Sequence, residues 1–200
     1  MRVALYGGSF NPPTLAHRAV VCQTLATCSN VDRVWITPAL KHAYGKALVD
    51  YSIRMHLCES LFQSIPCAHV SLLESELNSS TGSTYELLNY AKMSPGVDAV
   101  SLIVGQDQAE QIEDHWINGK ALIQEFSIIV LPRGDTSSVS VPWLNLGPHT
   151  LLPALPEEFR SISSTQARSA LAAKAKDSDL LKLMSPETIK LCNKLGLYHD

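Results

Sequence analysis

Gly7-Gly8-Ser9-Phe10-Asn11-Pro12-Pro13-Thr14-Leu15-Ala16-His17 is the stretch that decides the fold of this chain. It follows a short apolar segment, residues 3–6, and leads into residues 15–27, whose apolar side chains recur at helical spacing. The order of strand, glycine turn and helix start is typical of an anion site, in which backbone N–H groups and the positive end of a helix face a phosphate. The stretch therefore predicts a phosphate-binding corner at the end of a buried parallel strand.

A second polar segment, 162–168, lies near the other end of the chain. Ser163, Ser164 and Thr165 open a helix there, and Arg168 follows one turn later. Two phosphate-binding elements at opposite ends of one short α/β chain indicate a nucleoside triphosphate bound between them. Helix capping with a solvated arginine is the alternative interpretation of this segment.

The bulk composition fits one globular domain spanning residues 1–200. The chain is 46% hydrophobic and 18% charged, with a net charge of −3. This weakly acidic balance argues against nucleic acid as a partner, since no basic stripe is present to neutralise a phosphate backbone. The sequence shows no signal peptide and no apolar run long enough for a membrane helix, and its five scattered cysteines form no C-x-x-C pair. We expect free thiols, no membrane contact and a cytoplasmic location.

Strand and helix patterns alternate along the chain. Strands are predicted at 2–6, 32–37, 69–73, 99–104, 126–131 and 150–152, and helices at 15–27, 51–64 and 84–93, with others starting near 165, 179 and 186. Residues 135–147 are polar and irregular, which predicts a surface loop. This alternation is typical of a doubly wound parallel sheet, whose ligand cleft lies at the carboxyl ends of the strands. Gly7, Thr37, Gly105 and Arg133 would share that edge.

Thr14 and His17 lie three residues apart, on one face of the predicted helix start. A hydroxyl and an imidazole one turn apart, beside free N–H groups, can bracket phosphate oxygens. A structural or surface histidine is the alternative for His17 considered alone.

The two segments together resemble the paired signatures G-x-F-x-P-x-[HT]-x-x-H and I-S-S-T-x-x-R of the nucleotidyltransferase superfamily. Within it the chain is most similar to nicotinate/nicotinamide mononucleotide adenylyltransferases. The similarity also includes Gly105-x-Asp107, Trp116, the strand leading to Arg133, and the closing residues 195–198. It departs at Thr14 and Ala16, where many members carry histidine and glycine. The resemblance implies an α/β fold with a single Rossmann-like doubly wound parallel sheet and C-terminal helices.

The resemblance also implies a reaction. The 5′-phosphate of nicotinate or nicotinamide mononucleotide attacks the α-phosphorus of ATP in line, without a covalent intermediate, and pyrophosphate leaves with the Mg²⁺ carried by ATP. Such a transfer depends on positioning and charge neutralisation. The expected catalytic residues are His17 and Arg168. The residues expected at ATP and its phosphates are Gly8, Ser9, Phe10, Thr14, His17, Gly105, Asp107, Arg133, Ser163, Ser164, Thr165 and Arg168.

A further set of residues is expected at the mononucleotide. Its members are Asn11, Lys41, His42, Lys46, Thr84, Tyr85 and Trp116. By resemblance Trp116 would stack on the pyridine ring and the basic loop would hold substrate phosphate. A core tryptophan and a solvated basic loop are the alternatives. Asp107 is expected to accept hydrogen bonds from ribose hydroxyls or to cap the following helix, and Arg54 to pair with a carboxylate.

Other readings stay open at this stage. The acceptor can be phosphopantetheine, glycerol phosphate, choline phosphate or FMN, or the chain can be a nucleotide sensor without catalysis. A dehydrogenase-like dinucleotide binder is disfavoured because G-x-G-x-x-G is missing. No Cys/His constellation predicts a protein-bound metal. The sequence leaves open the choice between nicotinate and nicotinamide, and whether the chain forms a homo-oligomer.

Overall fold

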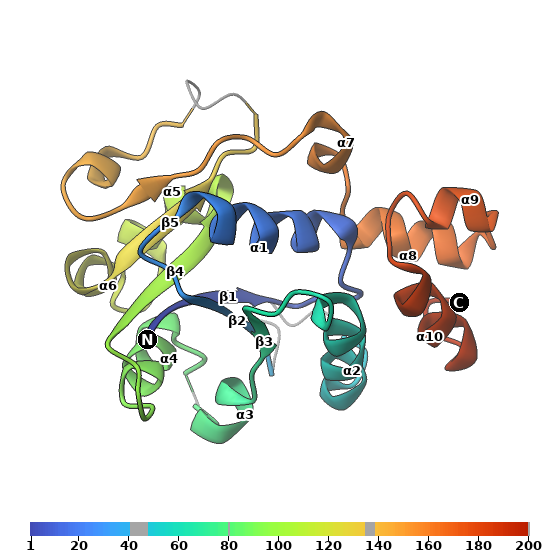
Figure 1. The fold of residues 1–200 in the computed structure, drawn as a ribbon, viewed down its shortest axis with the longest axis horizontal. Helices are drawn as coiled ribbons and strands as arrows, with labels where there is room; N and C mark the ends of the chain where they lie inside the picture. The colour runs from blue at the N-terminus through green and yellow to red at the C-terminus, as the bar shows by residue number, and fades with distance from the viewer. Residues whose placement is uncertain (41–47, 80, 135–138, 200) are drawn as a thin grey trace.

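The computed structural model describes residues 1–40, 48–79, 81–134 and 139–199 (Figure 1). At its centre is a six-stranded parallel sheet with the strand order β3-β2-β1-β4-β5-β6. The strands are β1 Arg2–Gly8, β2 Arg33–Pro38, β3 Ala68–Val70, β4 Ala99–Gly105, β5 Ser127–Leu131 and β6 Thr150–Leu151. The chain reverses its direction of travel across the sheet between β1 and β4, which is where a doubly wound sheet opens a ligand crevice. The predicted fold class is confirmed.

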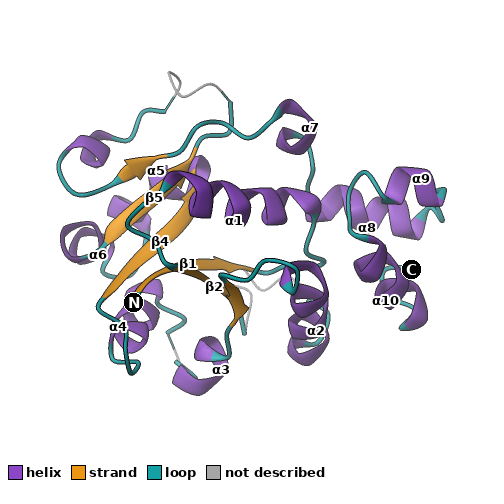
Figure 2. Cartoon of the chain, in the orientation of Figure 1, coloured by secondary structure: helices purple, strands orange, loops and turns teal. Residues whose placement is uncertain are grey.

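Helices cover both faces of the sheet (Figure 2). They are α1 Leu15–Thr27, α2 Tyr51–Phe62, α3 Leu73–Leu77, α4 Thr84–Lys92, α5 Gln106–His115, α6 Gly119–Glu125, α7 Glu157–Arg160, α8 Ser164–Ala172, α9 Asp177–Leu180 and α10 Pro186–Lys194, with a 3₁₀ turn, η2, at Pro142–Asn145. Helix α1 spans the predicted residues.

Successive side chains of β1 alternate between two apolar clusters, one on each face of the sheet. Val3 and Leu5 face the cluster that includes α4, α5 and α6, and Ala4 faces the cluster that includes α1 and α2. A strand buried on both faces reads as a continuous apolar run, as residues 3–5 do. This sandwiching fixes the carboxyl end of β1, and with it the position of the glycine turn.

The last three helices, α8 to α10, extend from one side of the sheet (Figure 1). They form a third apolar cluster with Leu57 of α2. The Leu15 N–H, in the first turn of α1, donates a hydrogen bond of 2.9 Å to the Leu183 carbonyl just before α10. The C-terminal helices are therefore attached directly to the helix that begins at the glycine turn.

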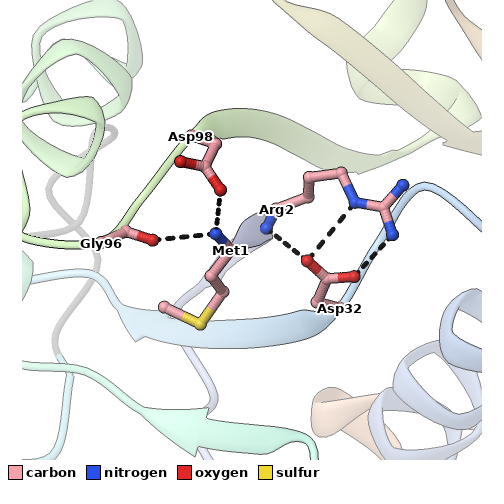
Figure 3. Close-up of polar contacts among 5 residues, drawn as sticks. All are labelled: Met1, Arg2, Asp32, Gly96 and Asp98. Carbon is pink, nitrogen blue, oxygen red and sulfur yellow. Dashed lines mark hydrogen bonds and ion pairs between the residues drawn. The ribbon is translucent and has the colours of Figure 1, made fainter.

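Polar contacts connect residues at the amino-terminal ends of the strands, at the edge of the sheet opposite the glycine turn (Figure 3). The Met1 amine donates to the Gly96 carbonyl at 2.9 Å and pairs with Asp98, which precedes β4. Arg2 pairs with Asp32, which precedes β2, at 2.6 Å from Nη2 to Oδ1. Hydrogen bonds from Arg2 lower the pKa of the Asp32 carboxyl to about 2. These contacts connect the start of β1 to the segments that precede both neighbouring strands.

The prediction of a polar surface loop over 135–147 is wrong for its described part. Trp143 lies in η2, is buried in the α4–α6 core, and its ring meets that of His149 edge-on at a centroid distance of 5.0 Å. The five cysteines are unpaired, as expected. Among the described residues, no helix combines the length and apolar character required to cross a membrane.

Candidate active site

The turn after β1 is anchored in the core by its aromatic residue. Phe10 has a φ of 45° and is almost fully buried, with its ring edge-on to Tyr6 and Phe62 at centroid distances of 5.5 and 6.4 Å. A Cβ on Gly8 would lie 3.3 Å from the Phe10 ring, so glycine lets the turn close over that ring. The Phe10 side chain is therefore part of the core and is not exposed to a ligand at the turn.

Thr14 and His17 form one unit at the start of α1. Thr14 is the N-cap residue, and its N–H donates to Nδ1 of His17 at 2.9 Å. The Thr14 Oγ1 atom lies 2.8 Å from the same nitrogen. His17 is half-buried against Phe10, at a centroid distance of 5.0 Å, and burial lowers the pKa of its imidazole to about 4. The imidazole is therefore neutral at physiological pH.

Arg54 of α2 connects the turn to two other backbone segments. Only 1% of its surface is exposed, and it donates three hydrogen bonds, to the carbonyls of Val49 (2.8 Å), Ser9 (2.8 Å) and Ala39 (2.7 Å). Its guanidinium also lies 5.6 Å from the Tyr51 ring centroid. Burial lowers the pKa of this guanidinium. The expected pairing with a carboxylate is wrong, because three carbonyl oxygens from three segments take the donors instead.

The second predicted element meets the first directly. Ser164 Oγ donates to the Pro12 carbonyl at 2.8 Å, and Arg168 Nη1 donates to the Asn11 carbonyl at 2.7 Å. Arg168 Nη2 also donates to Thr165 Oγ1 at 3.2 Å. The arginine is thus held at the turn and not simply solvated, and its guanidinium retains further donors.

Ser163 has the capping role that was the alternative for this segment. Its Oγ accepts a hydrogen bond from the Gln166 N–H at 3.2 Å, while its own N–H donates to the Gln166 side chain at 2.9 Å. Ser163 and Thr165 remain exposed at the start of α8. The helix start therefore keeps hydroxyls and N–H groups that can meet an anion.

Asn11 lies at the junction of the two elements and is 7% exposed. Its Oδ1 accepts hydrogen bonds from the Tyr198 hydroxyl at 2.7 Å and from the Val49 N–H at 3.3 Å. Tyr198 is a residue that motif reasoning missed as part of the site. The similarity of residues 195–198 to the family was the available signal. Asn11, expected at the mononucleotide, thus also holds the C-terminal segment against the turn.

Gly105, Asp107 and Arg133 meet at the carboxyl ends of β4 and β5. Gly105 is the N-cap of α5, and Asp107 lies in the first turn, where it forms an exposed ion pair with Arg133. The Arg133 N–H donates to the Gln106 side chain at 3.1 Å. The alternative that Asp107 caps the helix is wrong, because the cap position falls two residues earlier.

Thr84, Tyr85 and Trp116 lie on the α4–α6 side of the sheet. Thr84 is the first residue of α4, behind the buried Ser83, and Tyr85 donates from its hydroxyl to Glu125 at 2.9 Å. Trp116 ends α5 and is partly buried against the same core as Tyr85. Ten residues of helix place Trp116 about 15 Å along α5 from the end of β4. No hydrogen bond or ring contact between described residues joins these three to the glycine turn.

The remaining predictions concern ion binding. Lys41, His42 and Lys46 lie outside the described residues. Across the described ranges, no group of three or more histidine, cysteine or acidic side chains is arranged to hold a metal ion. The described groups at the junction of the turn and α8 are amides, hydroxyls, an imidazole and guanidinia, a set suited to anions.

A doubly wound sheet with two connected helix starts at its carboxyl edge defines a nucleotide-binding α/β protein. Residues 5–170 match the family model of cytidylyltransferase-like proteins. The chain is 30% identical to a "Probable nicotinate-nucleotide adenylyltransferase" of Anaeromyxobacter dehalogenans, over 98% of this chain and 96% of that protein. It is also 30% identical to a protein of the same name from Myxococcus xanthus, over 99% and 95% of the two chains.

A solved structure gives the same result. The nicotinic acid mononucleotide adenylyltransferase of Plasmodium falciparum, complexed with APC, superposes with a TM-score of 0.80 at 25% identity, covering 98% of this chain and 96% of that one. The same enzyme complexed with NaAD also gives a TM-score of 0.80. The chain belongs to the cytidylyltransferase-like family and, within it, to the nicotinate-nucleotide adenylyltransferases. The family predicted from the two signatures is confirmed.

Proposed function

We propose that this protein joins ATP and nicotinate mononucleotide to give deamido-NAD and pyrophosphate. A 5′-phosphate oxygen of the mononucleotide attacks the α-phosphorus of ATP. The bond from that phosphorus to the bridging oxygen breaks, and its electron pair leaves with pyrophosphate. The chemistry requires two anionic substrates to be brought into line and their charge neutralised, with no protein nucleophile.

The observation that carries this proposal is the direct bonding of the two phosphate-binding elements. The bonds from Ser164 to Pro12 and from Arg168 to Asn11 bring the start of α8 to the turn that precedes α1. A triphosphate lying across this junction would meet N–H groups from two helix starts. One end of it would be near His17 and the other near Arg168.

Each side chain at the junction then has a task that suits its chemistry. His17 would donate a hydrogen bond to the α-phosphate as charge builds up. Ser163, Ser164 and Thr165 would hold the β- and γ-phosphates with the α8 N–H groups, and Arg168 would neutralise the departing pyrophosphate. Gly8 and Ser9 would contribute backbone N–H groups. Mg²⁺ would arrive with ATP, since this ion prefers phosphate and water ligands and offsets phosphate charge.

The nucleoside parts are proposed to lie on either side of this junction. Gly105, Asp107 and Arg133 would receive the adenosine, with Asp107 accepting from ribose hydroxyls. Thr84, Tyr85 and Trp116 would line the pyridine pocket, and the basic residues Lys41, His42 and Lys46 would hold the mononucleotide phosphate together with Asn11.

Two observations favour nicotinate over nicotinamide as the substrate. One is the names of the relatives, and the other is an electrostatic feature of α4. Ser83 caps this nine-residue helix without a side-chain bond to it, and its buried Oγ has no partner among the described residues. The first N–H groups of α4 and the positive end of its dipole suit a carboxylate. The neutral carboxamide of nicotinamide would be stabilised less by the start of α4.

We also propose that residues 1–200 work as one nucleotidyltransferase domain, because Tyr198 and Leu183 bond back to Asn11 and Leu15. The cytoplasmic location expected from the sequence stays a prediction, and a homo-oligomer stays open.

The deciding experiment is pyrophosphate release with ATP and Mg²⁺, with nicotinate mononucleotide, nicotinamide mononucleotide, phosphopantetheine and FMN compared in parallel. We expect the highest kcat/KM with nicotinate mononucleotide. Turnover with phosphopantetheine or FMN alone would reassign the acceptor. Binding of ATP without release of pyrophosphate in any reaction would favour the nucleotide sensor.

A further inference from the structure

Thr14 holds the position at which a phosphate contact is expected, yet its side chain is enclosed. The residue is 0% exposed. Its Oγ1 lies 2.8 Å from Nδ1 of His17, and its N–H donates to the same nitrogen at 2.9 Å. In this arrangement the Thr14 hydroxyl contacts the imidazole, and the enclosed side chain is not available to substrate.

The contact with the backbone N–H determines where the imidazole carries its proton. A backbone N–H can only donate, so Nδ1 must present its lone pair to Thr14. The ring proton of the neutral imidazole then lies on Nε2, on the opposite side of the ring. The hydrogen bonds of the His17 ring to described residues are both at Nδ1, and the residue is half-buried. His17 can therefore offer a donor to an anion bound beside α1.

The surroundings of His17 favour the neutral ring. Its neighbours include the rings of Phe10 on the turn and Tyr6 on β1, at centroid distances of 5.0 and 6.2 Å. Tyr6 is the titratable group among these contacts, and burial raises the pKa of its phenol, so it supplies no negative charge at neutral pH. On α1 itself, Thr14 would meet a protonated Nδ1 with its own N–H, which opposes protonation.

We propose that Thr14 is a positioning residue, which holds His17 as the neutral Nε2–H tautomer so that a proton faces the α-phosphate of ATP. The inference rests on the proposed function for the identity of the phosphate, but the tautomer is a property of the protein alone. The Thr14 hydroxyl adds a second contact to the same ring nitrogen, Nδ1.

The test is long-range ¹H–¹⁵N correlation NMR of the ¹⁵N-histidine-labelled protein without substrates. We expect the coupling pattern of an Nε2–H ring for His17 in the wild type and in Thr14→Ser. In Thr14→Val, which keeps the shape and the backbone N–H and loses the hydroxyl, the Nε2–H pattern should be kept, because the N–H still donates to Nδ1. Only the contact of the hydroxyl with the ring is lost. The matched control is Thr24→Val in the same helix, since Thr24 is equally buried and donates to the Val20 carbonyl at 2.9 Å.

Kinetics supply a second readout with pyrophosphate release. Thr14→Val should lower kcat about tenfold, the size of one hydrogen bond, with KM for ATP changed less than about twofold and the acid limb of the pH profile moved upward. Thr14→Ser should restore kcat, and Thr24→Val should leave kcat and the pH profile unchanged.

An Nδ1–H pattern in the wild type would overturn the proposal, even if Thr14→Val failed to fold. An unchanged kcat in folded Thr14→Val would overturn it as well. A wild type with the expected tautomer and no adenylyl transfer would instead count against the proposed function.

Discussion

Arg168 Nη1 donates a hydrogen bond to the backbone carbonyl of Asn11, 2.7 Å away and 157 positions earlier in the chain. This contact ties the helix that would hold the ATP phosphates to the turn that would hold the site of attack. A guanidinium has five donors, so this bond and the one to Thr165 leave donors for a leaving group. The same side chain can thus build the junction and serve the reaction.

Arg168→Ala should lower kcat/KM for ATP by about a hundredfold, because a charged donor at the leaving group is lost. KM for the mononucleotide should change less than about threefold. The control is Arg160→Ala, since Arg160 also donates to a backbone carbonyl, that of Leu155, at 2.7 Å but outside the junction. Steady-state kinetics with each substrate varied in turn measure both values. A KM for the mononucleotide that rises as much as the KM for ATP would contradict the assignment of Arg168 to ATP.

His17 should make the stability of the protein depend on pH. Burial lowers the pKa of its imidazole to about 4, compared with about 6.5 in an unfolded chain. As the pH falls from about 6.5 to about 4, the unfolded chain takes up a proton that the folded chain does not. The free energy of unfolding should therefore fall across this window, by about 3 kcal/mol.

Urea unfolding at pH 7.5, 6 and 5 checks this dependence in the wild type and in His17→Gln. The variant should lose much of the pH dependence in this range, because glutamine does not titrate. Identical slopes for the two proteins would show that the His17 pKa is not lowered. The acid limb of turnover should likewise lie near pH 4 and not near pH 6.5.

Arg54→Met should lower the free energy of unfolding by about 3 kcal/mol, because the carbonyls of Val49, Ser9 and Ala39 all lose their buried donor. Chemical denaturation measures the change. Arg18→Met is the matched control: Arg18 is half-buried and its described bond is to Ser64, at 3.3 Å. Arg18→Met should lower the free energy of unfolding by less than about 0.5 kcal/mol. Similar losses of unfolding free energy in the two variants would contradict the proposal that Arg54 holds the three segments together.

Gly119→Ala should destabilise the protein by at least about 3 kcal/mol. A Cβ at Gly119 would lie 1.7 Å from the Ile112 carbonyl oxygen, so α5 and α6 could not keep their packing. Gly134→Ala should change stability by less than about 0.5 kcal/mol, since a Cβ there meets no atom within 4 Å. Thermal unfolding of the two variants compares them, and equal melting temperatures would be the contrary result.

The parts of the fold that local patterns determine were predictable from the sequence. The apolar run before Gly7 and the helical spacing after Thr14 gave β1 and α1, and the two signatures gave the family. Burial of Trp143 was missed, because the segment has no clear strand or helix pattern and most of the cluster that encloses the ring comes from distant segments. Local composition does not report such contacts.

In the site, too, local motifs identified some of the residues, whereas contacts between distant segments were not predictable. The residue types at His17 and Arg168 indicated phosphate chemistry from sequence alone. The bond from Tyr198 to Asn11 spans 187 positions, and the donors of Arg54 reach three separate segments. Phe10 was expected at phosphate but is anchored in the core, since an aromatic ring gains more from burial than from an anion.

The most direct test of the central claim is to quantify both products after the wild-type protein is mixed with ATP, Mg²⁺ and nicotinate mononucleotide. Adenylyl transfer across the junction of Gly7–His17 and Ser163–Arg168 predicts deamido-NAD and pyrophosphate in equal amounts, with turnover lowered about a hundredfold or more in His17→Ala. Pyrophosphate without deamido-NAD, or full turnover in His17→Ala, would contradict the account.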